Sequence, residues 1–357
     1  MKLTRRNILG GLAAAPAASA LAAPAIAQGK TEWRMVTSWP KNLPGPGVTA
    51  QRLADRITAM SGGRMTVKLY AAGEIVPALE VLTAVGAGAA EIGHTAPLFW
   101  AAKMPAAPIF TAAPFGLTAL EHIAWVEQGG GQALWEELYA PFRVRPFMAG
   151  NTGFQMGGWF KREVNSAADF KGLKMRIPGF GGLVLQRMGA TPVTIAPGEI
   201  FLSLSTGVID ATEFLGPFSD MAMGFHKAAR NYYAPGWHEP NGAAEAIVGL
   251  DAWATLPADL QAVVANACAA ENAHSLAESE WANAEALKRL TEEFGVSVRE
   301  FPADFLAEAR RITGEVMAEL AARDDLTRRI VDSYYAAARH QARWSQLSMQ
   351  GYMAARS

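Results

Sequence analysis

The sequence predicts an α/β protein built as two lobes, with a ligand cleft between them and a long helix at the C-terminus. Strand and helix patterns alternate in two separate stretches, 33–95 and 145–215, and this alternation produces sheets with parallel neighbours joined by crossover helices. Of the 357 residues, 330 follow the first 27, which is more than one hydrophobic core usually organises. Because such sheets bind ligands at the carboxyl ends of their strands, the cleft is expected there.

The first stretch contains strand and helix patterns in strict alternation. Apolar and polar residues alternate over 33–39 and 65–70, as in half-buried strands, and 91–95 is a third short strand. Residues 48–60 and 76–87 space their apolar side chains as helices do. This order predicts parallel pairing of the strands.

The second stretch repeats the alternation. A helix pattern covers 181–188, and another begins at Pro197 and ends at Gly207. The strand patterns lie at 145–155, 158–160, 172–177, 191–195 and 208–215.

These patterns give a domain organisation. We expect lobe I to comprise residues 28–153 and about 241–282, and lobe II to comprise residues 154–240 and about 283–323.

The C-terminal segment, 324–357, is predicted to be a long helix. Residues 303–323 and 326–353 lack proline, and the second of these stretches, at about 1.5 Å per residue, would be about 42 Å long. That length exceeds one lobe, and the helix carries apolar patches that one lobe covers only in part. Two interpretations remain open: the helix braces both lobes, or it is exchanged between two copies as a dimerisation element.

The first 27 residues have the pattern of a twin-arginine signal peptide. Arg5 and Arg6 precede an alanine-rich segment without acidic residues, and Ala25-Ile26-Ala27 provides a cleavage site. A membrane anchor would need a longer apolar core, of about 20 residues. The sequence therefore predicts export to the periplasm and cleavage after residue 27.

Composition and motifs argue against several classes of protein. The chain has 32 basic and 33 acidic residues, and loss of Lys2, Arg5 and Arg6 leaves 29 and 33, a net charge near −4, so a nucleic-acid partner is not supported. Cys268 is the only cysteine, so an intrachain disulfide cannot form. No H-E-x-x-H or G-x-S-x-G motif is present, and these are signatures of metalloproteases and serine hydrolases.

Glu213 is the most unusual residue of the predicted strands. It lies in 208–215, where alternation places it on an otherwise apolar face. A buried carboxylate needs a partner because an isolated charge is costly to bury. The partner could be a lysine or arginine in an ion pair, or a cation.

Two further residues could bind a ligand. Gln155, among apolar residues and glycines, carries a carbonyl oxygen that suits Na⁺ or Ca²⁺, although such an amide can also be satisfied by backbone groups. Arg176, at the end of a predicted strand before Pro178, offers a planar fork for a carboxylate. Its alternative is a surface arginine.

A zinc site is not expected at 237–240. Read as a strand, this segment places Trp237 and Glu239 on one face and His238 on the other. A paired histidine and glutamate ligand set is therefore not predicted there.

Several segments carry a resemblance to a known family. The chain resembles the TRAP-type solute-binding proteins, the extracytoplasmic receptors of sodium-driven carboxylate transporters, at the opening strand, at 69–74, at 169–176, at 207–211 and at 235–240. The resemblance covers essentially the whole mature chain. It implies a periplasmic-binding-protein fold with a hinge and no enzymatic activity.

Two segments, 207–214 and 224–227, are similar to the branch that binds 2-oxo monocarboxylates and lactate. This resemblance implies that Arg176 binds the substrate carboxylate, while Gln155, Glu213 and the Phe214 carbonyl ligate Na⁺ or Ca²⁺. Glu239 would be a further metal or substrate contact. The residues that would line the substrate site are Asn151, Trp100, Tyr70 and Phe180.

The resemblance also implies partners. The receptor would deliver a pyruvate-, 2-oxobutyrate- or lactate-like acid, as a cation complex, to a small and a large membrane subunit, and it would form a homodimer through the C-terminal helix. The alternatives are a receptor of the same family for another carboxylate, such as a C4-dicarboxylate or an aromatic or sugar acid, and a periplasmic enzyme that uses Glu213 as a general acid or base.

Overall fold

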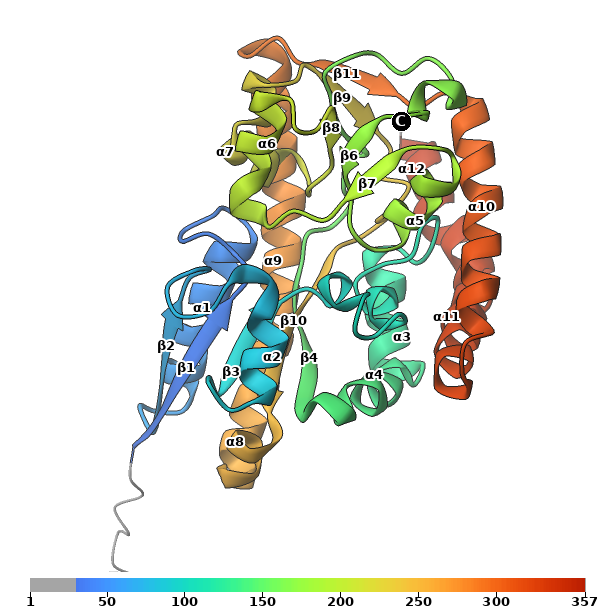
Figure 1. Cartoon of the computed structure of the whole chain (residues 1–357). Coiled ribbons are helices and arrows are strands. Elements are labelled where there is room, and N and C mark those ends of the chain that lie inside the picture. Colours follow the sequence, from blue (N-terminus) through green and yellow to red (C-terminus); the bar gives the residue numbers. More distant parts are fainter. Residues whose placement is uncertain (1–29, 357) are drawn as a thin grey trace, which may run out of the picture.

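Two mixed β-sheets organise the structure, a computed structural model that describes residues 30–356 (Figure 1). The predicted signal peptide lies outside the described residues. The first sheet has the order β2 (Met65–Tyr70), β1 (Thr31–Thr37), β3 (Ile92–Thr95), β10 (Ala243–Gly249) and β4 (Val144–Asn151). The second has the order β11 (Ser297–Glu300), β9 (Asn231–Ala234), β5 (Gly158–Phe160), β8 (Ala211–Thr212), β6 (Lys174–Arg176) and β7 (Thr191–Val193).

The strand directions follow the alternation in the sequence. In the first sheet β1 is parallel to both β2 and β3, as the sequence predicted. The strand β10 is antiparallel to β3 and β4, because the chain returns to this sheet from the second one. In the second sheet β6 is parallel to β7 and β8, so the carboxyl ends of β6 and β8 meet at one edge.

Helices cover the sheets and the ends of the molecule. They are α1 (Pro46–Met60), α2 (Val81–Gly86), α3 (Ala119–Gln128), α4 (Gly131–Tyr139), α5 (Gly179–Arg187), α6 (Ile200–Thr206), α7 (Pro217–Met223), α8 (Leu250–Thr255), α9 (Ala258–Glu292), α10 (Ala303–Ala321), α11 (Asp325–Ser345) and α12 (Gly351–Arg356). Short 3₁₀ turns and one π-helical turn complete the chain: Ala78–Glu80, Pro97–Trp100, Ala107–Phe110, Ala140–Phe142, Ala167–Phe170, Pro197–Glu199, Phe225–Lys227 and, as the π turn, Gln346–Gln350. Within residues 30–356 we find no helix with the length and apolar character needed to cross a bilayer.

The fold class predicted from the sequence, α/β with two lobes and a long C-terminal helix, is confirmed, but several elements are shorter than predicted. The strand expected over 145–155 ends at Asn151, because the chain leaves the first sheet through Gly153, whose φ is 65°. The strand expected over 208–215 is reduced to Ala211–Thr212, because the following residues turn into the space between the sheets. The helix expected over 76–87 is divided into a 3₁₀ turn and α2.

The 35-residue helix α9 runs along both sheets (Figure 1). On the side of the first sheet, Glu271 accepts from Arg52 Nε of α1 at 2.7 Å. On the side of the second, the Asn283 side chain accepts from the Phe218 backbone N–H at 2.9 Å. The strand β10 lies in the predicted lobe I and β11 in the predicted lobe II; the lobe boundaries themselves stay a prediction.

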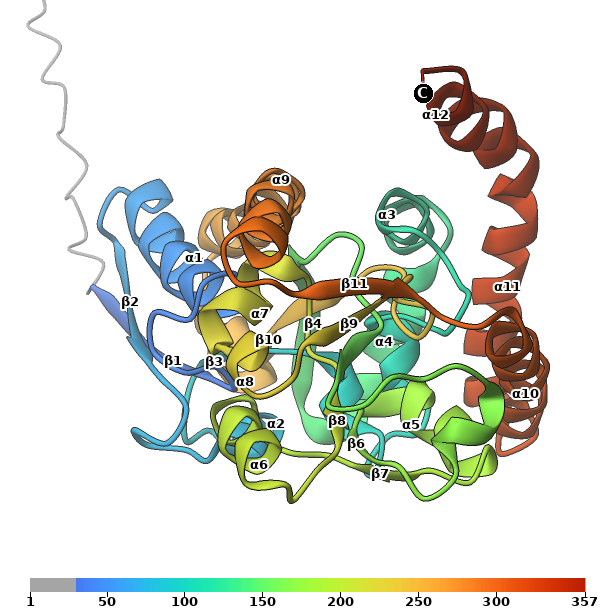
Figure 2. The same ribbon diagram turned by 90° about the horizontal axis from the view of Figure 1, so that it is seen from above.

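The C-terminal helix is only half covered. Ile330, Val331 and Tyr334 of α11 are buried, and Tyr334 Oη accepts from the Leu117 backbone N–H at 2.8 Å. Beyond Ser345 the chain continues through the π turn into α12 and extends past the body of the molecule (Figure 2). The first half of the helix therefore packs on the body, and the second half offers an open surface.

Glu245 places a carboxyl group inside the first sheet. The side chain is fully buried on β10, and Oε1 accepts from Trp100 Nε1 at 2.6 Å. Its Oε2 has no hydrogen-bond partner among the described residues, and neither does the Tyr139 hydroxyl. Burial raises the pKa of Glu245 to about 8, so the group is protonated at neutral pH.

We predict that Glu245→Gln removes a pH dependence of stability. The folded-state pKa lies above the unfolded value, so the stabilising contribution of Glu245 is complete below about pH 4.5 and is lost as the pH rises to about 8. Relative to Glu245→Gln, the parent should lose on the order of 3 to 5 kcal/mol of unfolding free energy across this range. Urea unfolding of both proteins at pH 5 and pH 8.5 measures the difference, and parallel pH profiles would contradict the assignment.

Candidate functional site

A small cavity of about 40 Å³ lies between the two sheets. Its polar walls come from the second sheet and from the chain that crosses between the sheets, whereas its other wall is apolar. The residues that line it are Trp39, Pro46, Ala96, Leu98, Phe99, Thr111, Thr152, Gln155, Arg176, Pro178, Glu213, Phe214, Leu215, Glu239, Gly242, Ala243 and Ala244.

Adjacent parallel strands bring Arg176 and Glu213 together. The strand β6 ends at Arg176 and β8 ends at Thr212, so Glu213 is the first residue past the ladder. The Glu213 backbone N–H donates to the Arg176 carbonyl at 3.1 Å, which fixes the register of the two strand ends. This is the carboxyl edge of the sheet, where ligands of such sheets bind.

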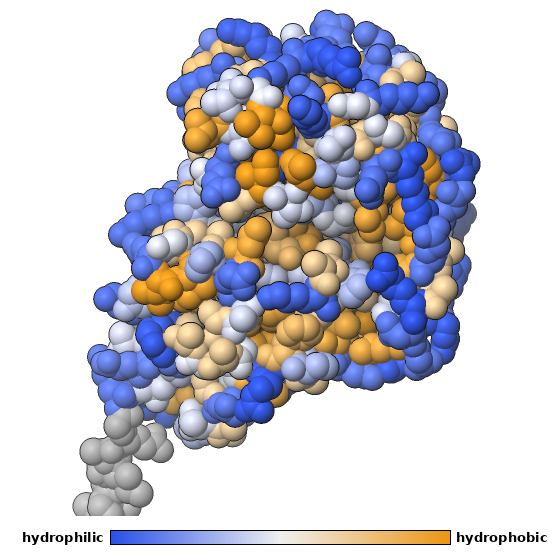
Figure 3. All heavy atoms as spheres, in the orientation of Figure 1, coloured by the Kyte–Doolittle hydropathy of each residue, from blue (hydrophilic) through white to orange (hydrophobic). Residues whose placement is uncertain are grey.

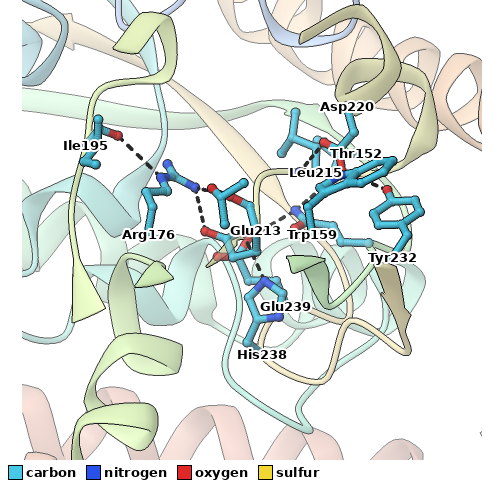
Figure 4. Close-up of polar contacts among 12 residues, drawn as sticks. Thr152, Trp159, Arg176, Ile195, Glu213, Leu215, Asp220, Tyr232, His238 and Glu239 are labelled. Carbon is cyan, nitrogen blue, oxygen red and sulfur yellow. Dashed lines mark hydrogen bonds and ion pairs between the residues drawn. The ribbon is translucent and has the colours of Figure 1, made fainter. Parts of the chain in front are cut away.

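The Arg176 and Glu213 side chains form a buried ion pair (Figure 4). Arg176 Nη1 lies 2.6 Å from Glu213 Oε1 and 2.9 Å from the Glu213 carbonyl oxygen, and Nε donates to the Ile195 carbonyl at 3.4 Å. Both side chains are at most 2% exposed. The structure thus contains the ion pair that was one interpretation of Glu213, and the interpretation of Arg176 as a surface residue is wrong.

One edge of the guanidinium remains open. Arg176 Nη1 and Nε both donate hydrogen bonds, but no described residue accepts one from Nη2. The guanidinium lies 5.7 Å from the centre of the Phe214 ring. An anion that enters the cavity therefore finds a donor that the protein itself does not use.

His238 and Glu239 complete an acidic cluster. His238 Nε2 lies 3.2 Å from Glu213 Oε2, and Glu239 Oε2 accepts from Gln155 Nε2 at 3.1 Å. One ligand atom from each of Glu213, His238 and Glu239 lies within 4.8 Å of the others. All three side chains are buried.

The expectation that 237–240 is a strand, with His238 facing away from the acidic side, is wrong. The segment follows the turn at Pro235-Gly236 and has no partner strand in either described sheet, so the alternation of side chains does not apply. His238 is the functional-site residue that sequence reasoning missed. The proline and glycine before it and Asn241-Gly242 after it were signals of a turn.

Gln155 carries an unsatisfied oxygen. Its Nε2 donates to Glu239 and, at 3.1 Å, to Thr152 Oγ1, which orients the amide. Its Oε1 is buried without a partner among the described residues. The backbone alternative for this side chain is therefore not what the structure shows, and an orphaned carbonyl oxygen beside two carboxylates is a donor set that suits Na⁺ or Ca²⁺.

The electrostatics of the cluster reflect excess negative charge. Burial, with a contribution from the charge of Glu213, raises the pKa of Glu239 to about 7. Burial is the largest effect on His238 and opposes its charge, but the hydrogen bond to Glu213 and the negative charges of Glu213 and Glu239 together raise the pKa of that imidazole. A cation at this point would stabilise the ionised form of both carboxylates.

A second buried acid supports the loop behind the cluster. Asp220 Oδ1 accepts from the Leu215 backbone N–H at 3.0 Å, and Oδ2 accepts from Trp159 Nε1 at 2.9 Å and from the Tyr232 hydroxyl at 2.8 Å (Figure 4). Burial raises the pKa of Asp220 to about 7. The contacts fix the backbone just past Phe214.

Four predicted lining residues lie elsewhere. Trp100 is in the core with its indole N–H on Glu245, and Asn151 Nδ2 donates to Asn241 Oδ1 at 3.2 Å where the chain leaves β4. Phe180 lines a separate hollow of about 640 Å³ on α5. Figure 3 shows apolar residues gathered across the middle of one face of the molecule. Tyr70 is half-buried at the end of β2. Of the residues predicted to bind substrate or cation, the cavity is lined by Gln155, Arg176, Glu213, Phe214 and Glu239.

Comparison with known proteins places the chain in a family. Residues 35–324 match the model of the bacterial extracellular solute-binding proteins, family 7. A monocarboxylate 2-oxoacid-binding periplasmic protein from Nostoc sp. is 39% identical over 98% of both chains.

Solved structures agree. A TRAP periplasmic solute-binding protein from Colwellia psychrerythraea, with bound calcium and pyruvate, is 37% identical, with a TM-score of 0.88 over 91% of this chain and 99% of that one. One from Pseudoalteromonas atlantica, with bound sodium and pyruvate, is 38% identical, with a TM-score of 0.88 over 91% of this chain and 98% of that one. The chain therefore belongs to family 7 of the bacterial extracellular solute-binding proteins.

Proposed function

We propose that this protein is the periplasmic receptor of a TRAP transporter and that it binds a 2-oxo or 2-hydroxy monocarboxylate together with Na⁺ or Ca²⁺. The observation that carries the proposal is the buried, unpartnered Gln155 Oε1, in a cavity that Glu213, Glu239 and Arg176 also line. The relatives with pyruvate and a cation support the same pairing of ligand and ion.

In this proposal one group of residues binds the cation and Arg176 binds the carboxylate of the acid. Gln155 Oε1, a Glu213 oxygen and the Phe214 carbonyl would hold the cation, and Glu239 stands beside them. No donor among the described residues bonds the Phe214 carbonyl. When bound, the cation would neutralise the carboxylates and chelate two oxygens of the acid. Arg176 would bind the acid carboxylate through Nη2, because its other nitrogens are occupied.

The opposite wall favours one carboxylate over two. Trp39 donates its indole N–H to His94 Nδ1 at 2.8 Å, so it offers the cavity only its ring. Leu98, Phe99 and Ala96 complete this wall. The hydroxyl of Thr111, which accepts from the Leu98 backbone N–H at 3.1 Å, is the polar side-chain group beside these residues. A second carboxylate would be buried there without a charged partner, at a high cost, so the wall disfavours the C4-dicarboxylate alternative.

The same geometry weighs against catalysis by Glu213. Each of its carboxylate oxygens already accepts a hydrogen bond, one from Arg176 and one from His238. Neither oxygen is unpartnered, as a general base facing a substrate would need, but each keeps a second lone pair that can bind a cation. We propose that the protein is not an enzyme and that it delivers its ligand to the small and large membrane subunits of a TRAP transporter.

Glu213→Gln should lower the affinity for pyruvate with Ca²⁺ on the order of 100-fold, because it removes a cation ligand and leaves Arg176 buried without its counter-charge. Arg176→Lys should lower it strongly as well, since lysine keeps the charge but cannot bond Ile195 and Glu213 and at the same time present a separate donor to the acid, as Nη2 does. Isothermal titration measures both, with the exposed Glu199→Gln as the matched control. If both variants bind as the parent does, the site is wrongly placed.

The ligand class is tested by thermal unfolding of the mature protein with pyruvate, 2-oxobutyrate, lactate and succinate, each with Ca²⁺, Na⁺ or EDTA. A monocarboxylate at 100 times its Kd should add about 2.7 kcal/mol of stability, and EDTA or removal of Na⁺ should abolish the shift. Succinate should give none. A larger shift with succinate than with pyruvate would instead support the dicarboxylate alternative.

We also propose a homodimer through the C-terminal helix. Trp344 is 71% exposed, and Leu347, Tyr352 and Met353 are each at least half exposed. This is a run of large apolar side chains on a helix that extends past the body (Figure 2). Such a run suits burial against a second copy.

Trp344→Glu should convert the dimer to a monomer, because a carboxylate would be buried in the helix contact. Light scattering coupled to size exclusion gives the mass, and Lys171→Glu, on an exposed turn, is the control. A monomeric parent protein would contradict the proposal.

A further inference from the structure

The segment 40–46, which we call the strap, joins β1 to α1 and reaches from the first sheet to the second. It contains Asn42 with φ 58° and Gly45 with φ 82°, and these left-handed residues let it turn twice within a few residues. Its two ends border the ligand cavity, because Trp39 precedes it and Pro46 closes it, and both line the cavity.

Leu43 of the strap is buried against the second sheet, although the strand and the helix on either side of the strap belong to the first sheet. It is 6% exposed and belongs to a hydrophobic cluster with Trp159, Ile200 and Phe214. Every other described member of that cluster lies between residues 156 and 296, around the second sheet. Leu43 is thus the one side chain that residues 30–155, the described part of the chain before the second sheet, contribute to this core.

Polar and close contacts support the same docking. Ser219 Oγ of α7 donates to the Pro44 carbonyl at 3.0 Å. Gly45 approaches Ser219 so closely that a Cβ there would lie 2.6 Å from the hydroxyl oxygen. At the start of the strap, a Cβ on Gly198 would lie 3.6 Å from the Pro40 ring.

We infer that the strap is the clasp that holds the two lobes closed around the ligand, and that Leu43 is a positioning residue for ligand capture. The inference rests on the proposed function. When the lobes separate, Leu43 leaves the second core and becomes exposed; when the ligand draws them together, Leu43 is buried again. A side chain that is buried only in the closed state raises ligand affinity without touching the ligand.

Leu43→Ala should lower the affinity for pyruvate with Ca²⁺ by roughly tenfold or more, mainly through faster dissociation. Ser219→Ala should act in the same direction, and the volume-conserving Leu43→Met should bind as the parent does. The thermal midpoint of ligand-free Leu43→Ala should equal that of the parent, because Leu43 is already exposed in the open protein. A lowered ligand-free midpoint with unchanged affinity would show a static core residue and overturn the inference.

Accessibility of the strap can be tested directly with a thiol. The lone Cys268 is buried, so a maleimide should react slowly with the parent. Leu43→Cys should react fast without ligand and be protected by pyruvate with Ca²⁺, whereas Leu53→Cys, in the core of the first sheet, should resist in both states.

The outcomes separate the two proposals. No reaction of Leu43→Cys in ligand-free protein, or equal reaction with and without a ligand that the parent binds, would overturn the clasp. Fast reaction without ligand, combined with a parent that binds none of the acids, would support the opening of the strap and refute the proposed ligand instead.

Discussion

The burial of Arg176 against Glu213 is the constraint on which the rest of the site depends. Removing two charges from water is costly, and only good geometry with further hydrogen bonds compensates for it. The register of β6 and β8 supplies the geometry, because it sets Glu213 one residue past the end of the ladder. The carbonyls of Ile195 and Glu213, together with His238, supply the further bonds. The polar groups of the cavity then gather on one side around this pair, and the opposite wall can remain apolar.

The buried acidic groups form two layers, counted outward from the cavity. Nearest the cavity are Glu213 and Glu239, which meet the unsatisfied oxygen of Gln155. Behind them Asp220, with its donors from Trp159 and Tyr232, holds the backbone at Leu215. The inner layer has one carboxylate more than Arg176 neutralises, and the outer layer is held in place by its hydrogen bonds. A site of this kind is preorganised for a cation and has little need to rearrange when one arrives.

The sequence predicted the fold class and the parallel start of the first sheet, and it singled out Arg176 and Glu213 without pairing them with each other. Those depend on local periodicity and on where strands end. It did not place Trp100 or Phe180, because an aromatic residue in a buried element can face either a core or a cavity and the residue type does not distinguish them. It missed His238 because a short turn was read as a strand. Trp39 went unrecognised as a cavity wall because its role depends on His94, which lies 55 residues away.

The helix α9 limits how the molecule can move. Its 35 residues, Ala258–Glu292, contain neither proline nor glycine, so it is about 52 Å long and has none of the residues at which helices break sharply. The two chain crossings beside it, in contrast, carry Gly153, Gly157, Gly236 and Gly242. Rotation of one lobe against the other would therefore fall on the glycines of the crossings, whereas the unbroken α9 would have to bend along its length. The elastic resistance of this one helix would then limit how far the lobes open.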